Sequence, residues 1–377
     1  MPDTLIRAGA GPAAQLILEL LPEPVILVRG GDGEAPEITY GNQAAREVFR
    51  IELEGAPLGA ALRRPEVLEA IEEALEASSN AEVTFETIGV QPRFWRAFAR
   101  TLEVEAGGDR LLVVVLRDET DARRTERMRA DFLANASHEL RTPLASLAGF
   151  VETLRTHAKE DPEAREKFLG IMAQQTTRMA RLVDDLLSLS RIELNEHIAP
   201  SGRVDLSGAV QDVTDAIRPL TAERGVMIAM NVEGVARPVI GDRDQLVQVI
   251  QNLVDNAVRY TPRGGAVRVT LETAANLEAA RGSSRRGAGL SLLSPDVNEG
   301  QSYVVLRVSD DGPGIPRQVL PRLSERFYRV EGQRSGGTGL GLAIAKHVIN
   351  RHRGGLTVES AEGEGSTFSV YLPVAAQ

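Results

Sequence analysis

Cysteine is absent from the 377-residue chain. Disulfide bridges, zinc–thiolate sites, iron–sulfur clusters and cysteine nucleophiles are therefore excluded. The absence is compatible with a reducing compartment. Any chemistry that the chain performs must come from other side chains.

Basic residues are in the minority. The chain has 43 Lys and Arg against 53 Asp and Glu, a formal net charge of −10. A surface that binds nucleic acid needs clustered Lys and Arg to neutralise phosphates. A direct nucleic-acid partner is therefore not expected.

Long apolar runs are also lacking. The best candidate, 13–28, is interrupted by Glu19, Pro22, Glu23 and Pro24, whereas a membrane-spanning helix needs roughly 20 mostly apolar residues. We expect neither a signal peptide nor a spanning helix. The expected location is the cytoplasm, with any contact to a membrane made through a partner.

The length exceeds that of one ordinary domain, since domains usually have about 100–200 residues. The pattern changes near 118 and 196, which predicts three domains: 1–117, 118–195 and 196–377. In the first, short apolar runs separated by turn residues predict a small α+β domain. Its expected helices are 16–21 and 42–49, and its expected strands are 25–28, 38–40, 83–88, 95–104 and 111–115.

The second region, 118–195, has the period of long helices. Apolar residues recur every three or four positions along two stretches, which a polar break at 159–162 separates. Two amphipathic helices joined by a short turn form a hairpin. Because a hairpin cannot bury both apolar stripes alone, we expect a homodimer built on a four-helix bundle.

The third region, 196–377, alternates strands and helices. The segment 274–300 has no clear period and is rich in Gly, Ser and Arg, which predicts a surface insertion. The expected helices are 242–259, with Asp242 as the N-cap, and 339–351. The expected strands are 267–271, 303–309, 355–359 and 367–372.

A reactive histidine is indicated by the string His-Glu-Leu-Arg-Thr-Pro at 138–143. Helical spacing puts His138 and Thr142 on one face. Glu139 can accept a proton from one ring nitrogen, which raises the nucleophilicity of the other. Pro143 removes a helical hydrogen bond and is expected to kink the helix, at a cost of roughly 3 kcal/mol that indicates a functional reason.

A polar helix face follows in the third region. Asn252, Asn256, Arg259 and Tyr260 recur at spacings of three and four, so they line one side of the helix. Amide oxygens can ligate Mg²⁺, a cation that prefers oxygen. Arg259 can contact phosphate, and Tyr260 can pack on a base. Taken alone, the string also fits an ordinary polar face in water.

Two glycine-containing strings complete the set. Asp-Asp-Gly-Pro-Gly-Ile-Pro at 310–316 follows an apolar strand, where a carboxylate can accept from an adenine amine and glycines let the backbone approach a ligand. Gly-Gly-Thr-Gly-Leu-Gly-Leu at 336–342 opens a helix, whose free N–H groups can bind phosphate. The second is no dinucleotide fingerprint, because it does not follow the first strand of a βαβ unit.

In this order, the four strings resemble the H, N, G1 and G2 boxes of sensor histidine kinases, and Glu-Arg-Phe-Tyr-Arg at 325–329 resembles their F box. The resemblance covers roughly residues 120–375 and is most similar to the phosphate-regulon sensors. It implies autophosphorylation by ATP, transfer to an aspartate of a response regulator, and phosphatase activity toward that regulator. It also implies a C-terminal two-layer α/β sandwich of the gyrase-like ATPase type.

The resemblance implies a role for each matching residue. His138 corresponds to the phosphoacceptor, Glu139 to the acidic residue that activates it, and Thr142 to the position that places a water for dephosphorylating the partner. Asn256 corresponds to the Mg²⁺ ligand, and Asp310 to the residue that reads the adenine amine. The expected ATP-binding residues are Asn252, Asn256, Arg259, Tyr260, Asp310, Gly312, Gly314, Arg329, Gly337, Thr338, Gly339, Leu340 and Gly341.

The N-terminal region resembles a PAS sensor domain. The resemblance rests on Leu-Leu-Pro-Glu-Pro-Val-Ile-Leu-Val at 20–28, followed by Asn42 and a short helix. Residues 1–117 contain neither His nor Cys, which excludes a His-ligated haem and a cysteinyl flavin adduct. A dimerisation module without a ligand is the alternative.

Three other functions fit parts of the sequence. One is a scaffold that binds nucleotide and partner without phosphorylating, and another is a phosphotransfer module that has lost ATP binding. A third is a gyrase-like ATPase, but those relatives carry a Glu where Asn252 stands. The intact His138, Asn256 and Asp310, together with the glycines, favour the kinase.

Overall fold

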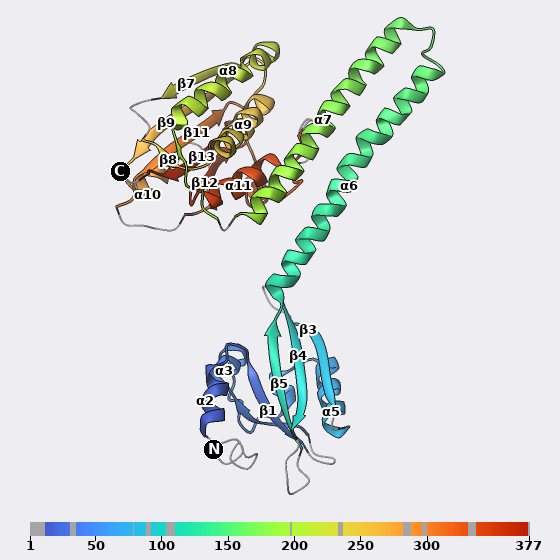
Figure 1. Cartoon of the computed structure of the whole chain (residues 1–377), viewed down its shortest axis with the longest axis vertical. Helices are drawn as coiled ribbons and strands as arrows, with labels where there is room; N and C mark the ends of the chain where they lie inside the picture. The colour runs from blue at the N-terminus through green and yellow to red at the C-terminus, as the bar shows by residue number, and fades with distance from the viewer. Residues whose placement is uncertain are drawn as a thin grey trace. The chain divides into compact units, whose positions relative to one another are not determined.

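The computed structural model describes residues 12–30, 35–77, 79–87, 92–102, 110–196, 198–232, 237–281, 288–295, 300–330 and 337–375. The chain divides into two compact units, Met1–Asp131 and Phe132–Gln377 (Figure 1). Within the described residues, no helix is long and apolar enough to cross a membrane.

An antiparallel five-stranded sheet organises the first unit, in the order β2-β1-β5-β4-β3. Its two faces follow the strand period of two: Ile26 and Val28 pack with the helices α3, α4 and α5, whereas Leu27 points to the opposite face with Leu18 of α2. The strands are β1 (Val25–Gly30), β2 (Glu37–Gly41), β3 (Asn80–Thr87), β4 (Arg93–Leu102) and β5 (Arg110–Asp118), and the helices are α2 (Pro12–Leu20), α3 (Gln43–Phe49), α4 (Leu58–Ala61) and α5 (Pro65–Glu76).

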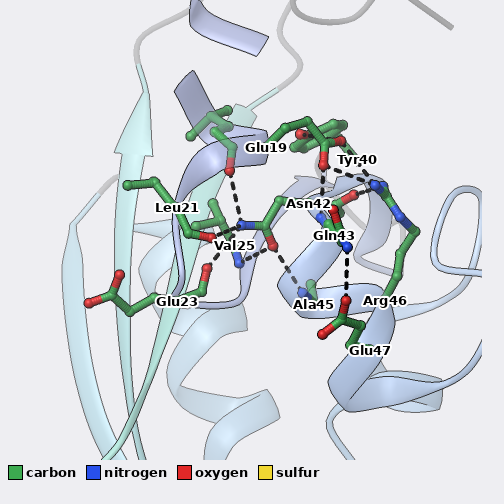
Figure 2. A network of polar contacts seen from close by, with 12 residues as sticks. Glu19, Leu21, Glu23, Val25, Tyr40, Asn42, Gln43, Ala45, Arg46 and Glu47 are labelled. Carbon is green, nitrogen blue, oxygen red and sulfur yellow. Dashed lines mark hydrogen bonds and ion pairs between the residues drawn. The ribbon is translucent and has the colours of Figure 1, made fainter. Parts of the chain in front are cut away.

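A buried asparagine ties α2, β1 and α3 together in this unit (Figure 2). Asn42 is fully buried, and its Oδ1 accepts from the backbone N–H groups of Val25 and Ala45, at 2.9 and 3.0 Å. Its Nδ2 donates to the carbonyl oxygens of Leu18 and Glu23, at 3.0 and 2.9 Å, and more weakly to a third carbonyl. One side chain therefore satisfies backbone groups from three elements.

An ionic contact reinforces the same junction on its exposed side. The Glu19 carboxylate receives hydrogen bonds from the Tyr40 hydroxyl, the Gln43 backbone and the Arg46 guanidinium. Burial raises the pKa of Glu19, but these three donors outweigh it and leave the pKa below its ordinary value. Helix α2 is thus held at two points on the β2–α3 corner.

The helical hairpin consists of α6 (Thr120–Arg155) and α7 (Pro162–Leu194). Asp161 caps α7 by accepting from the N–H groups of Glu163 and Ala164, and Pro162 stands at the first helical position, where its missing N–H costs nothing. Helix α6 continues through Pro143, so the kink expected there stays a prediction. On α7, Leu182, Leu189 and Ile192 are buried in the core of the region that follows.

A six-stranded sheet, in the order β10-β12-β13-β11-β9-β7, forms one layer of that region. The helices α8, α9 and α11 form the second layer on one face (Figure 1). The alternate residues Val304, Leu306 and Val308 of β11 face these helices, whereas Tyr303 and Val305 face the other side with α10. The elements are α8 (Leu206–Arg224), β7 (Met227–Val232), α9 (Arg243–Tyr260), β9 (Ala266–Ala274), α10 (Leu277–Arg281), β10 (Ala288–Leu293), β11 (Tyr303–Asp310), α11 (Gly341–Arg351), β12 (Gly355–Ala361) and β13 (Gly365–Pro373); β6 (Arg203–Val204) pairs with β8 (Val239–Ile240), and η1 (Arg317–Arg322) is a 3₁₀-helix.

A buried histidine joins the start of α9 to the end of α11. His352 donates from Nδ1 to the Val348 carbonyl at 2.7 Å and accepts at Nε2 from the Asp242 N–H at 3.0 Å. This pairing requires the neutral ring, and burial lowers the pKa of His352 accordingly. Asp242 caps α9, as predicted, by accepting from the N–H groups of Asp244 and Gln245.

The expected multidomain fold is confirmed: an α+β PAS-like sheet, a helical hairpin and a two-layer sandwich. The surface insertion predicted at 274–300 is wrong at 288–293, because β10 pairs with β12 and forms the edge of the sheet. Parts of that segment, like the expected strand ends at 88 and 103–104, lie outside the described residues. Helices α5 and α8 have no counterpart among the predicted elements.

Replacing Asn42 with alanine should destabilise the first unit by about 3 kcal/mol, because buried donors and acceptors would lose their partner. Urea unfolding measured by tryptophan fluorescence tests this, since Trp95 is the sole tryptophan and is buried in this unit. Gln43→Ala is the control: its side chain donates to the exposed Glu47, so a change within about 0.5 kcal/mol is expected. Equal effects of the two substitutions would contradict the role of Asn42.

Candidate functional site

A cavity of about 880 Å³ lies in the second unit, between α7, α9 and the segments that flank α11. Its volume is in the range of small-molecule sites, about 300–1,000 Å³. Eleven of the residues predicted to bind ATP line it: Asn252, Asn256, Arg259, Tyr260, Asp310, Gly314, Arg329, Gly337, Thr338, Gly339 and Gly341.

Helix α9 contributes one polar face to this cavity, as its spacing predicts. Asn252 donates from Nδ2 to the Gly341 carbonyl at 3.1 Å and thereby fixes the first turn of α11. Asn256 and Tyr260 are half-buried on the same face. The face therefore positions α11 as well as lining the cavity.

Charged groups of opposite sign lie at one end of the cavity. Burial lowers the pKa of Arg259, although Tyr260 and Asp255 oppose the shift. Burial raises the pKa of Asp255, against the attraction of Arg259. A cation that has been partly stripped of water and faces a cavity is well suited to bind phosphate.

The strand β11 ends in the second polar group. Asp310 is buried, and its Oδ1 accepts from the Gly312 N–H at 2.9 Å, which fixes the carboxylate at the cavity wall. Gly314, at φ +72°, lies against the Ala361 carbonyl, where a Cβ would have no room. The neighbouring Asp311 instead braces the adjacent strand, because its Oδ2 accepts from the Ala266 N–H at 3.1 Å.

The glycine-rich segment is described from Gly337 onward, and Gly336 lies outside the described residues. Gly339 has φ +73°, and a Cβ there would lie 2.8 Å from the backbone of Phe327. Phe327 itself has φ 63° and donates its N–H to the Gly339 carbonyl at 2.9 Å. This hydrogen bond helps to hold Phe327 in the left-handed region, a conformation that is costly for a residue with a side chain, whereas Gly339 adopts it freely.

Two predicted site residues lie beside the cavity without lining it. Leu340 is fully buried in the core at the start of α11. Gly312 acts through its N–H on Asp310. Both residues therefore support residues of the cavity wall without lining the cavity themselves.

The predicted reactive histidine lies on α6, outside this cavity lining. His138 is exposed, and the Thr142 hydroxyl donates to its carbonyl at 3.2 Å, as residues four apart on one helix can. The Glu139 carboxylate accepts from the Arg178 guanidinium of α7 at 2.9 Å and so forms an ion pair across the hairpin. Arg178 also lines the cavity.

The sequence prediction missed the contribution of α7. Arg178, Arg181 and Asp185 line the cavity, and they are spaced by three and four, as one helix face requires. The Thr338 hydroxyl donates to Asp185 at 2.7 Å. The signal was available as a polar face between the apolar positions, but nothing in the sequence says that this face meets the glycine-rich segment.

Together these groups suit a planar base linked to phosphates. A buried carboxylate and an aromatic ring can hold a base, whereas Arg259, Arg329 and backbone N–H groups at the start of α11 can hold phosphates. The oxygen donors of Asn252, Asn256 and Asp255 suit a hard cation. Among the described residues, no group of three or more His, Cys, Asp or Glu is arranged to hold a metal ion.

Three family models match the chain. Residues 15–83 match the PAS domain, 128–195 the His Kinase A (phospho-acceptor) domain, and 241–376 the histidine kinase-, DNA gyrase B- and HSP90-like ATPase. The last two contain His138 and the cavity residues of α9, respectively.

Curated relatives match about 70% of the chain. Phosphate regulon sensor protein PhoR of Pseudomonas aeruginosa is 36% identical over 70% of this chain and 54% of its own length. Sensor histidine kinase WalK of Bacillus subtilis is 33% identical over 70% and 39%, and sensor-like histidine kinase SenX3 of Mycolicibacterium smegmatis is 33% identical over 70% and 62%. The chain thus spans about half the length of these relatives. Among solved structures, histidine kinase ThkA in complex with response regulator protein TrrA aligns with a TM-score of 0.47 at 18% identity, over 96% of this chain and 98% of that one.

Gly339→Ala should destabilise the second unit by about 2–3 kcal/mol, because the new Cβ adds a backbone clash to the strain of a positive φ. Gly363→Ala is the matched control: φ is +82° but the space is open, so a cost of about 1 kcal/mol is expected. Calorimetric unfolding of both variants makes the comparison, with Trp95 fluorescence marking the first unit separately. A Gly339 variant as stable as the Gly363 variant would show that the contact with Phe327 is dispensable.

Proposed function

Because the chain belongs to the sensor histidine kinases, we propose that it phosphorylates His138 with ATP and transfers the phosphoryl group to an aspartate of a response regulator. The observation that carries this proposal is the cavity itself, which brings together the polar face of α9, Asp310 and the glycine-rich segment. These come from positions far apart in the sequence, so their meeting supports a single nucleotide site.

Within this site, we assign the adenine to Asp310 and Tyr260. The Gly312 N–H donates to Asp310 Oδ1 and orients the carboxylate, a group whose oxygens can accept from an exocyclic amine. The Tyr260 ring is half-buried at the cavity. We assign the phosphates to Arg259, near the end of α9, and to the backbone N–H groups at the start of α11. Arg329 would supply a second positive charge.

Asn256 would hold Mg²⁺ through its amide oxygen, and Asn252 supports it by fixing α11. Bound there, the ion would neutralise phosphate charge. Catalysis by the chain's own residues would otherwise rest on positioning, because Asn252 stands where gyrase-like ATPases carry the water-activating Glu.

In the transfer step, one ring nitrogen of His138 attacks the γ-phosphorus, a P–N bond forms, and the bond to the β-phosphate oxygen breaks. Glu139 would take up or orient the proton of the other ring nitrogen. Its carboxylate is bound to Arg178 in this structure, so the proposal requires Glu139 to share or exchange that partner. Transfer to an aspartate of the regulator then regenerates the free imidazole.

We also propose that the protein acts as a homodimer through a four-helix bundle. The hairpin leaves large apolar side chains exposed in the single chain, which supports burial against a second copy. These are Leu133, Leu144, Val151, Leu169, Val183 and Leu187.

The division into domains at 117/118 and 195/196 and the cytoplasmic location likewise stay predictions.

Labelling with γ-labelled ATP and Mg²⁺ tests the kinase proposal. The native chain should take up acid-labile, base-stable label, and His138→Ala should reduce it by at least about a hundredfold, since the acceptor atom is gone. His157→Ala is the matched control, because His157 is also exposed at the end of the same hairpin. A native chain that binds nucleotide without taking up label would instead indicate a scaffold.

Thr142→Ala should separate the proposed phosphatase activity from the kinase activity. We expect self-labelling to stay within about twofold while dephosphorylation of a phosphorylated receiver domain slows on the order of tenfold, because a positioned water is lost. Thr153→Ala provides the control, since its hydroxyl likewise donates to the carbonyl four residues earlier on α6. If both activities fall together, Thr142 supports the helix and not the water.

A further inference from the structure

The wall of the cavity is shared between the sandwich and the hairpin. Arg181 and Asp185 of α7 line it together with Thr338 of the glycine-rich segment. The Thr338 hydroxyl donates to Asp185 Oδ2 at 2.7 Å, which makes this a contact to a charged acceptor. The contact joins positions 153 residues apart in the sequence.

The geometry of Thr338 allows one hydroxyl to serve two elements. Its oxygen accepts from the Leu340 N–H at 3.3 Å, at the N-cap position of α11, while its proton goes to Asp185. Leu340 is fully buried. The contact therefore links α7 to the rigid start of α11 through the segment that the sequence predicts to hold phosphate.

Asp185 is held in place by its own helix. Leu182 and Leu189, three residues before it and four after it, are buried in the core of the sandwich. Burial raises the pKa of Asp185, and the Thr338 hydroxyl opposes this shift. A half-buried carboxylate in this position would be left short of donors if Thr338 moved away.

We propose that Asp185 is a positioning residue of the nucleotide site, which holds the glycine-rich segment 337–341 through Thr338. This inference rests on the nucleotide site proposed above and adds a residue from the hairpin to it. The pair keeps the wall of the cavity in the arrangement that receives the phosphates. By thermodynamic reciprocity, bound nucleotide strengthens the contact between sandwich and hairpin by the same factor.

Four variants isolate the pair in the 377-residue chain. Asp185→Ala and Thr338→Ala each remove one partner. Asp185→Asn keeps an acceptor oxygen without the charge, and Thr338→Ser keeps the hydroxyl. Ser188→Ala is the matched control: Ser188 lies on the same helix and donates to Gln248 of α9 at 2.9 Å, a second contact between hairpin and sandwich that does not involve Thr338.

The measurement is titration with a fluorescent, non-hydrolysable ATP analogue in the presence of Mg²⁺. Both alanine variants should bind about fivefold or more weakly, which is within the usual range of coupling between sites. The double alanine variant should lose no more than either single variant, because both remove the same contact. Asp185→Asn, Thr338→Ser and Ser188→Ala should stay within about twofold of the native chain.

A kinetic readout separates positioning from a general structural defect. In the labelling assay, Asp185→Ala should raise KM for ATP by the same factor and leave the rate at saturating ATP unchanged, since the pair does not touch the reacting atoms. Should Asp185→Ala fail to fold, the comparison of Thr338→Ala with Thr338→Ser carries the same test.

Unchanged affinity in both alanine variants, or losses that multiply in the double variant, would overturn the role of Asp185 while leaving the kinase proposal intact. A native chain that neither binds the analogue nor labels His138 would overturn the proposed function itself, and the role of Asp185 with it. The two failures are therefore told apart by the native chain alone.

Discussion

The second unit depends on the burial of one face of a hairpin helix in the core of the neighbouring sandwich. Leu182, Leu189 and Ile192 of α7 lie in the same apolar cluster as the inner faces of α9 and α11. Full burial of such side chains contributes about 1.5–3 kcal/mol each. Because the three lie on one side of α7, their burial fixes the rotation of that helix, and with it the direction of its polar face.

Polar contacts continue from the apolar face to the C-terminal end of α7 and the residues just after it. Beyond the cavity, the carboxylate of Glu193 pairs with Arg326, and that of Glu196 accepts from Asn350 at 2.6 Å. Next to the Glu193–Arg326 pair, Phe132 of α6 packs on Phe327, with ring centroids 5.8 Å apart, and Arg326 lies over the Phe132 ring. Hairpin and sandwich therefore meet through an apolar centre with ionic contacts at its edge.

Features of the fold and the site that are set within a single helix or strand could be predicted from the sequence, whereas features that depend on contacts between elements could not. Asn252, Asn256, Arg259 and Tyr260 share a cavity because helical spacing alone puts them on one face, and Asp242 is a cap because its position before a periodic run demands one. Helix α5 was not predicted, although the helical spacing of its buried residues Val67, Ile71 and Ala74 contained the signal. The partner of Glu139, the edge strand β10 and the role of Asp185 were not predictable, since each depends on which surfaces meet after folding.

His352 links this arrangement to acidity. Its ring accepts from the Asp242 N–H only while neutral, and its pKa in the folded chain lies below the ordinary 6.5. Well above pH 6.5 the His352 ring is neutral in both the folded and the unfolded chain, so the full stability is present. Below that value the unfolded chain takes up a proton that the folded chain resists, and stability declines by up to about 1.4 kcal/mol per pH unit. Acid would therefore weaken the contact that His352 makes between the start of α9 and the end of α11. The same contact that holds these two helices beside the cavity thus sets a lower pH limit on the stability of the cavity.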